Sequence, residues 1–227
     1  MMISQIINKL HSELPATVKL VAVSKFHPFE SIEQAYAAGQ RIFAESRPQE
    51  LQAKVRELEA RRPDMSDVQW HFIGHLQTNK LKMVLPYASL VQSVDSAHLL
   101  DAIQNWAAAN GRDVNVLLEP HVAQEETKQG FSEDDIYSVL QSARQGRYQN
   151  IRFCGIMGMA TFTDDRSVIS GDFAKLRHIF DQCRERFPFI ADTFTELSTG
   201  MSDDYPLAIE YGSTMVRIGS MIFGDRV

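Results

Sequence analysis

The sequence predicts an α/β fold, a (β/α)8 TIM barrel with an extra helix before its first strand. Short apolar, β-branched runs alternate with longer stretches of helical spacing along the chain, which is typical of parallel strands covered by helices. About eight such pairs fit within 227 residues, near the small end of the range for this barrel. The 44% hydrophobic content supplies one substantial core, so we expect a single domain over residues 1–227. A doubly wound open sheet is the alternative.

The first half of the chain contains the extra helix and four strand–helix pairs. The helix, at 3–10, is expected to plug or flank the bottom of the barrel. Strands are expected at 18–24, 41–45, 68–74 and 90–95, each followed by a helical pattern, at 28–38, 49–62, 79–85 and 99–110. Pro28 begins one helix, and Gly39 and Gly111 end two of them, as these residue types commonly do.

The second half continues the alternation. Strands are expected at 113–120, 151–159, 194–198 and 215–224, and helices from 132 onward, over 172–186 and over 203–211. Ser132 is followed by three acids, and a serine N-cap with acids in the first turn is favourable for a helix. The segments 61–67 and 163–170 are expected to be surface connections.

Composition and charge exclude several classes of partner. The formal net charge is -6 and the pI is about 5.6, whereas nucleic-acid or anionic-membrane binding needs a basic face.

Cys154 and Cys183 lack both metal-ligand spacing and the density of a disulfide framework, which favours a reducing cytoplasm. No signal peptide and no apolar run of membrane-spanning length is evident. We therefore expect a cytoplasmic protein. Because no exposed apolar seam is obvious, we expect it to be a monomer.

Lys25 follows the first strand, where barrels of this kind place their active-site loops. Most lysines at such a position are simply solvated. Alternatively, an amine at the barrel mouth, backed by an apolar strand, has a lowered pKa and acts as a nucleophile towards aldehydes. Position alone leaves both interpretations open.

The loop after the seventh strand, at 198–204, directly precedes a helix. Ser202 is a good N-cap there, and Asp203 and Asp204 suit the helix dipole, so ordinary capping explains the loop. The loop also suits an anion, because Gly200 permits close backbone approach and a helix N-terminus offers free N–H groups. The two aspartates oppose a phosphate unless their carboxylates point away from it.

The last strand carries the most information. Arg217 interrupts an otherwise apolar run, and a buried arginine without an acceptor would be costly. It therefore points either outward to a carboxylate or into the barrel mouth. Gly219 and Ser220 follow and suit a phosphate shared with the loop around Ser202. Since the eighth strand neighbours the first in a closed barrel, Lys25, Arg217 and the Gly219–Ser220 turn are expected to converge.

Two other motifs are weaker. His71 and His75 lie at the end of the third strand without a nearby carboxylate or cysteine pattern, so packed or hydrogen-bonded histidines are favoured and no metal is assigned. Met157 and Met159 follow the sixth strand, where methionines are more often core than cofactor wall.

At these residues the sequence resembles the pyridoxal phosphate homeostasis proteins, single-domain relatives of the barrel domain of alanine racemase. The segments that carry the resemblance are AVSK at 22–25, WHFIGHLQTNK at 70–80, STGMSDD at 198–204 and STMVRIGSMIFG at 213–224. Together they span nearly the whole chain in a fixed order.

The resemblance implies a fold-type III barrel whose cofactor is pyridoxal 5′-phosphate (PLP), held as a Schiff base on Lys25. It implies that Ser202, Gly219 and Ser220 hold the phosphate and that Arg217 faces the pyridine nitrogen. Where the family commonly has Gly-Glu-Asn, this chain has Ala44, Glu45 and Ser46, so Ser46 could replace the asparagine contact only at shorter reach. The complete set of residues expected at the cofactor is Lys25, Ser46, Met157, Gly200, Met201, Ser202, Arg217, Gly219 and Ser220.

The expected function follows from that set. A positive guanidinium at the pyridine nitrogen keeps the nitrogen unprotonated and the ring a weak electron sink. In alanine racemase, a second acid/base comes from a tyrosine on a C-terminal domain of the partner subunit, and this chain ends at Val227 after the barrel. We therefore expect a homeostasis protein that buffers PLP or delivers it to PLP-dependent apoenzymes, without catalytic turnover. A weak amino-acid racemase and a phosphosugar enzyme without PLP are the alternatives.

Overall fold

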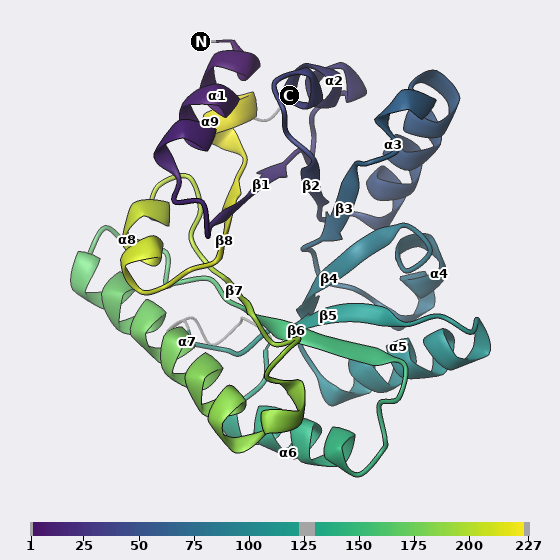
Figure 1. The fold of residues 1–227 in the computed structure, drawn as a ribbon, viewed down its shortest axis with the longest axis vertical. Helices are drawn as coiled ribbons and strands as arrows, with labels where there is room; N and C mark the ends of the chain where they lie inside the picture. Colours follow the sequence, from purple (N-terminus) through teal and green to yellow (C-terminus); the bar gives the residue numbers. More distant parts are fainter. Residues whose placement is uncertain (1, 123–129, 225–227) are drawn as a thin grey trace.

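The computed structural model describes residues 2–122 and 130–224. Its strands are parallel and form one closed barrel in the order of the chain, and Figure 1 shows them around a common centre with the helices outside. This confirms the (β/α)8 barrel and excludes the doubly wound sheet, which has open edges. The strands are β1 Lys19–Val23, β2 Ile42–Glu45, β3 Gln69–Phe72, β4 Ala88–Val94, β5 Val114–Leu118, β6 Ile151–Met157, β7 Glu196–Ser198 and β8 Met215–Ile218.

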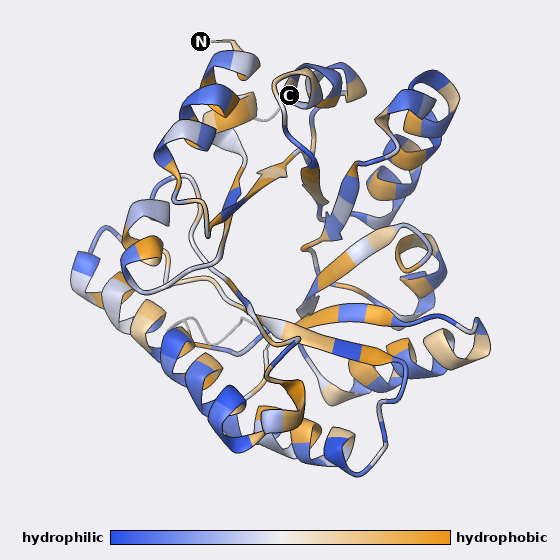
Figure 2. Ribbon diagram, in the orientation of Figure 1, coloured by the Kyte–Doolittle hydropathy of each residue, from blue (hydrophilic) through white to orange (hydrophobic). Residues whose placement is uncertain are grey.

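The helices form the outer layer. In Figure 2 the hydrophobic residues of these helices concentrate on the sides that face the sheet, because burying an apolar stripe against the strands is what stabilises an amphipathic helix. Within the described residues, no helix combines the length and the apolar character needed to cross a bilayer. The helices are α1 Ile3–Glu13, α2 Phe29–Ala37, α3 Pro48–Arg61, α4 Leu81–Val84, α5 Ala97–Ala109, α6 Glu133–Arg144, α7 Arg166–Arg186, α8 Tyr205–Glu210 and α9 Ser220–Phe223.

The additional N-terminal helix, α1, flanks the barrel and does not plug it. It packs against α2 and α9, beside which it lies in Figure 1. Ile7 and Leu10 are buried in this contact, and the His11 ring lies 3.0 Å from Gln40 Oε1. The Gln40 amide in turn donates to the Leu20 and Ile42 carbonyls of β1 and β2. The helix is thereby attached to the first strands of the barrel.

Several expected boundaries were wrong. The last strand ends at Ile218, and Ser220–Phe223 is a helical turn. The long helix begins at Arg166, where Asp165 caps it by accepting from Ser167 N at 2.8 Å. Residues 166–170 of the expected surface connection are therefore helical. Helix α8 begins at Tyr205, with Asp204 in the N-cap position that we expected for Ser202. The helix expected over 79–85 is only the 3-10 turn Thr78–Lys80 and the single turn α4.

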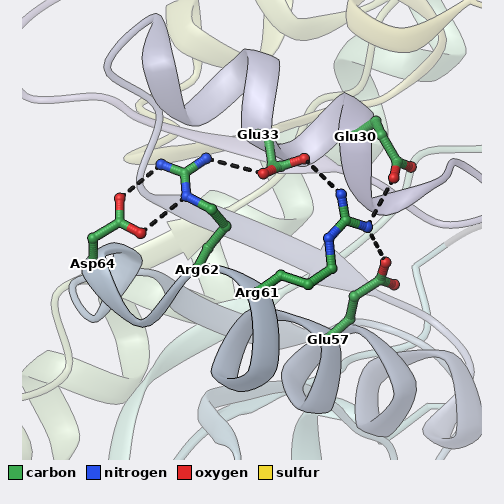
Figure 3. A network of polar contacts seen from close by, with 6 residues as sticks. All are labelled: Glu30, Glu33, Glu57, Arg61, Arg62 and Asp64. Atoms are coloured by element: carbon green, nitrogen blue, oxygen red, sulfur yellow. Dashed lines mark hydrogen bonds and ion pairs between the residues drawn. The ribbon is translucent and has the colours of Figure 1, made fainter.

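Helices α2 and α3 are joined by a network of ion pairs, shown in Figure 3. Arg61 Nη1 lies 2.8 Å from Glu30 Oε1, and Arg62 Nη1 lies 3.0 Å from Glu33 Oε1. Exposed pairs of this kind contribute little individually, but together they connect the C-terminal end of α3 to α2. The members of the network are Glu30, Glu33, Glu57, Arg61, Arg62 and Asp64.

Candidate functional site

A pocket of about 480 Å³ lies at the carboxyl ends of the strands, where barrels of this architecture bind their ligands. It brings together most of the residues expected from the sequence: Lys25, Met157, Met201, Ser202, Arg217, Gly219 and Ser220. The remaining lining residues are Val23, Phe26, His27, Ile73, Met159, Asp203 and Gly224.

The expected convergence of the first and last strands is present. Strands β1 and β8 pair in parallel, with Val21 opposite Arg217 and Ala22 opposite Ile218. Lys25 therefore leaves β1 next to the point where Gly219 leaves β8. A Cβ atom at Gly219 would lie 3.2 Å from the Val23 carbonyl oxygen, so a glycine lets the two chain segments approach closely.

The turn that carries Lys25 has an unusual backbone. Phe26 has a φ of 68°, in the left-handed region that non-glycine residues rarely adopt without compensating interactions. The compensation comes from helix α3, because the Glu50 carboxylate accepts a hydrogen bond from Phe26 N at 2.6 Å. The conformation of the turn after Lys25 is thus imposed by a side chain from another element.

Beneath this turn lies a buried ionic cluster that the sequence analysis did not identify. The Lys54 ammonium donates to Glu45 Oε1 at 2.7 Å, to Glu50 Oε1 at 2.9 Å and to the Ser24 carbonyl at 2.7 Å. Ser24 Oγ also donates to Glu45 Oε1, at 2.6 Å. Both charged partners are out of water, since Glu45 is 0% and Lys54 5% exposed. The cluster ties α3 and β2 to the residue that immediately precedes Lys25.

Burial raises the pKa of Glu45 to about 7, against the opposing effect of the Lys54 ammonium. The folded chain therefore holds this proton more firmly than the unfolded chain, in which the pKa is about 4.5. Consequently, the contribution of Glu45 to the free energy of unfolding is greatest below pH 4.5 and is lost as the pH rises through about 7.

This gives a first testable prediction. Relative to Glu45→Gln, the parent chain should lose unfolding free energy between about pH 5 and pH 7, by up to about 1.4 kcal/mol per pH unit. Urea unfolding of both proteins at several pH values in this range measures the difference. The same difference at every pH would mean that Glu45 does not titrate there.

Arg217 points into the barrel, as one of the two sequence interpretations expected. Its guanidinium donates to Ser198 Oγ at 2.8 Å and to the Gly158 carbonyl at 3.0 Å, and the residue is 4% exposed. Burial lowers the pKa of Arg217 to about 10, opposed by the charges of Glu119 and Asp204, so the group remains cationic at neutral pH. Because a guanidinium has five N–H groups, donors remain for a ligand in the pocket that Arg217 lines.

Two serine hydroxyls form a polar end of the pocket. Ser202 Oγ lies 3.2 Å from Ser220 Oγ and 3.5 Å from Met221 N. One of the two aspartates is turned back onto its own loop, because Asp204 Oδ1 accepts from Met201 N at 2.6 Å. Asp203 still lines the pocket.

Ser46 and Gly200 do not line the pocket. The backbone of Ser46 packs against Gly74, where a Cβ would lie 2.0 Å from the Ser46 carbonyl oxygen. Gly200, with a φ of 92°, accepts a hydrogen bond from Arg217 N at 3.0 Å. A Cβ there would lie 2.6 Å from Ala208 Cβ, so Gly200 acts on the pocket by letting its loop pack on α8.

Several lining residues were missed by the sequence analysis. Phe26 and His27 follow Lys25 directly, and this adjacency was the only available signal. His27 stacks on Phe223 of α9 with 5.2 Å between ring centroids.

The two histidines considered as metal ligands have separate partners, Gln92 for His71 and Asp95 for His75. No group of three or more potential metal ligands occurs in the described part of the chain.

Residues 3–227 match the model of the alanine racemase N-terminal domain family. The pyridoxal phosphate homeostasis protein of Haemophilus influenzae is 35% identical over 92% of this chain and 86% of its own length. The human pyridoxal phosphate homeostasis protein is 34% identical over 99% of this chain and 82% of its own.

Solved structures show the same relationship. PipY of Synechococcus elongatus with PLP bound is 34% identical, with a TM-score of 0.89 over 98% of this chain and all of that one. Alanine racemase from E. faecalis is 16% identical, with a TM-score of 0.73 over 98% of this chain and 57% of that one. The second likeness shows the fold alone.

Proposed function

This chain belongs to the alanine racemase N-terminal domain family and, within it, to the pyridoxal phosphate homeostasis proteins, and we propose on that premise that it binds PLP and serves in PLP homeostasis. One observation carries the assignment: an amine, a buried guanidinium and two serine hydroxyls line the same pocket, through Lys25, Arg217, Ser202 and Ser220. PLP presents a matching aldehyde, pyridine nitrogen and phosphate.

The residues present fit this cofactor. The Lys25 amine would hold the aldehyde carbon covalently as a Schiff base. Ser202 and Ser220 would donate hydrogen bonds to the phosphate, close to the Gly219 backbone. Ile73, Met157, Met159 and Met201 line the pocket and would supply apolar wall around the ring, as is usual for cofactor pockets. When bound, PLP supplies an electrophilic carbon and a conjugated ring.

Arg217 supports a role in holding the cofactor without turnover. A guanidinium that remains cationic at neutral pH disfavours protonation of a nearby pyridine nitrogen, and so weakens the ring as an electron sink. We propose that the protein buffers PLP as a cytoplasmic monomer and transfers it to PLP-dependent apoenzymes. Exchange of the α-hydrogen of an amino acid for deuterium by the PLP-loaded protein would contradict the absence of turnover.

Absorbance tests the covalent hold. The purified chain with added PLP should show the absorption band of a lysine-bound Schiff base, and borohydride should fix one cofactor onto Lys25, which peptide mass analysis locates. Lys25→Ala should lose the band and the fixed label. The matched control is Lys175→Ala, because Lys175 lies on α7 with its side chain 61% exposed and should leave both unchanged. Equal labelling of Lys25→Ala and the parent chain would refute the assignment of Lys25.

A further inference from the structure

A second cavity lies at the opposite end of the barrel from the candidate cofactor pocket. This lower cavity has a volume of about 540 Å³. Its walls come mainly from the amino-terminal ends of the strands, where Lys19 begins β1, Gln69 begins β3 and Glu196 begins β7. His71, on β3, also lines the lower cavity and is 4% exposed.

A chain of buried hydrogen bonds runs through the barrel from the cofactor pocket to the lower cavity. Arg217 Nη1 and Ser198 Oγ are 2.8 Å apart. Ser198 Oγ and Gln92 Oε1 are 2.7 Å apart. Gln92 Nε2 and His71 Nδ1 are 2.8 Å apart. Arg217 lines the candidate cofactor pocket and His71 lines the lower cavity. This single series of hydrogen bonds therefore connects the two.

The chemistry of Arg217 fixes the direction of every bond in that chain. A guanidinium can only donate, so Ser198 Oγ accepts from it and gives its own hydrogen to Gln92 Oε1. The Gln92 amide is thereby oriented, and its Nε2 donates to His71 Nδ1. An imidazole that accepts at Nδ1 carries its hydrogen at Nε2 when it is neutral. Burial lowers the pKa of His71 to about 3, so the ring is neutral at physiological pH.

His71 Nε2–H consequently remains as a donor on a ring that lines the lower cavity. None of the described residues accepts a hydrogen bond from this Nε2–H, whereas the Nδ1 atom of the same ring is bonded to Gln92. His71 Nε2 is not one of the fully buried polar atoms without a partner in the described chain, so it is reached from the cavity that the ring lines. The site is therefore suited to a molecule that brings an acceptor oxygen into the cavity.

The charges around the lower cavity narrow the class of that molecule. Lys19 forms an ion pair with Glu196, whose second oxygen accepts from Thr214 Oγ1 at 3.1 Å. The carboxylate of Glu196 is thus already neutralised. Two opposite charges on the wall, Arg152 and Asp192, form no ion pair with another described residue.

We propose that the lower cavity binds a small carboxylate, with one carboxylate oxygen accepting from His71 Nε2–H and Arg152 supplying the opposing charge. Arginine is suited to this role because its planar fork matches a carboxylate. Asp192 would add a contact to the ammonium group if the carboxylate belongs to an amino acid. This site is separate from the proposed PLP site and does not depend on it.

The test uses the full chain without added PLP, and acetate, glycine and inorganic phosphate as probes. Nitrogen-15 NMR of the His71 ring should show a neutral Nε2–H imidazole, and acetate should shift that resonance saturably. Arg152→Gln, at an exposed position, should retain the fold and bind acetate about tenfold more weakly, as expected for the loss of one charge-assisted hydrogen bond. Glycine binding more tightly than acetate, with the advantage lost in Asp192→Asn, would identify an amino acid.

Three results would overturn the proposal. The first is the absence of a saturable shift, or a shift that chloride at equal ionic strength reproduces. The second is unchanged acetate affinity in Arg152→Gln. The third is tighter binding of inorganic phosphate than of acetate.

Ser198→Ala tests the direction of the hydrogen bonds separately, because it frees the Gln92 amide to reverse. We expect a mixture of His71 tautomers and weaker acetate binding in that variant, and an unchanged tautomer would refute the locked direction.

Discussion

Lys54→Met should lower the free energy of unfolding by about 1–3 kcal/mol at neutral pH, the usual cost of leaving buried acceptors without their donor. The Glu45 carboxyl then takes up a proton, because the Lys54 ammonium is one of the groups that hold its pKa down. The methionine fills the volume of the aliphatic stem but leaves Glu45, which is 0% exposed, without its cation. It also removes the donor to the Ser24 carbonyl. Urea unfolding monitored by circular dichroism measures the change.

Two companion variants make this result interpretable. Lys9→Met removes an ammonium that is 63% exposed and lies 3.8 Å from Glu13, so we expect it to cost less than about 0.5 kcal/mol. The double variant Glu45→Gln with Lys54→Met removes both ionisable groups. It should recover the part of the loss that appears at high pH, because no buried carboxyl can then ionise without its cation. A single variant as stable as Lys9→Met would show that the buried cluster does not support the turn.

On the proposal that PLP binds in the candidate cofactor pocket, Arg217→Glu should produce the largest change in the chemistry of the bound cofactor. The substitution replaces a cation by a carboxylate that can accept a hydrogen from the pyridine nitrogen, which favours protonation of that nitrogen and makes the ring a stronger electron sink. We expect slow transamination-like conversion of bound PLP with an amino acid, detectable by absorbance. The new carboxylate also meets the charges of Glu119 and Asp204, so the variant should be less stable than the parent by several kcal/mol.

Arg217→Gln is the control for this experiment. It removes the guanidinium from Ser198 and Gly158 without introducing a carboxylate. Both variants should lose stability, but only the glutamate variant should convert the cofactor. Nitrogen-15 NMR of PLP labelled in the ring reports protonation of the pyridine directly. Identical spectra for the parent and both variants would mean that Arg217 does not face the ring.

The features that were predictable from sequence are those encoded by local patterns. Alternating apolar runs predicted the strands, and Ser132 with its acids predicted the start of α6, where Ser132 Oγ does accept from Asp135 N. The convergence of Lys25 with Arg217 was predictable because a closed barrel must bring its first strand beside its last. The match to a known family supplied the proposed cofactor, which these patterns alone left open.

The features that escaped prediction depend on long-range contacts. Lys54 lies on a charged helix and has the pattern of a solvated residue, and only the packing of α3 beneath the Lys25 turn buries it. The apolar run after Ile218 reads as a continued strand, yet Gly219 ends it, and Ile222 N and Phe223 N bond back to the Gly219 carbonyl. The polar chain to His71 joins three further strands, so no local pattern reveals it.

The pairing of β1 with β8 also sets the order in which the site can be completed during folding. Lys19 and Met215 are opposite each other in this pair, although nearly the whole described chain separates them in sequence. During synthesis the Lys25 turn emerges early, but its neighbours Arg217 and Ser220 emerge with the last strand. A ligand that bridges the two strand ends binds only the closed ring, and so favours closure by mass action. The availability of that ligand would then influence how many newly made chains complete the barrel.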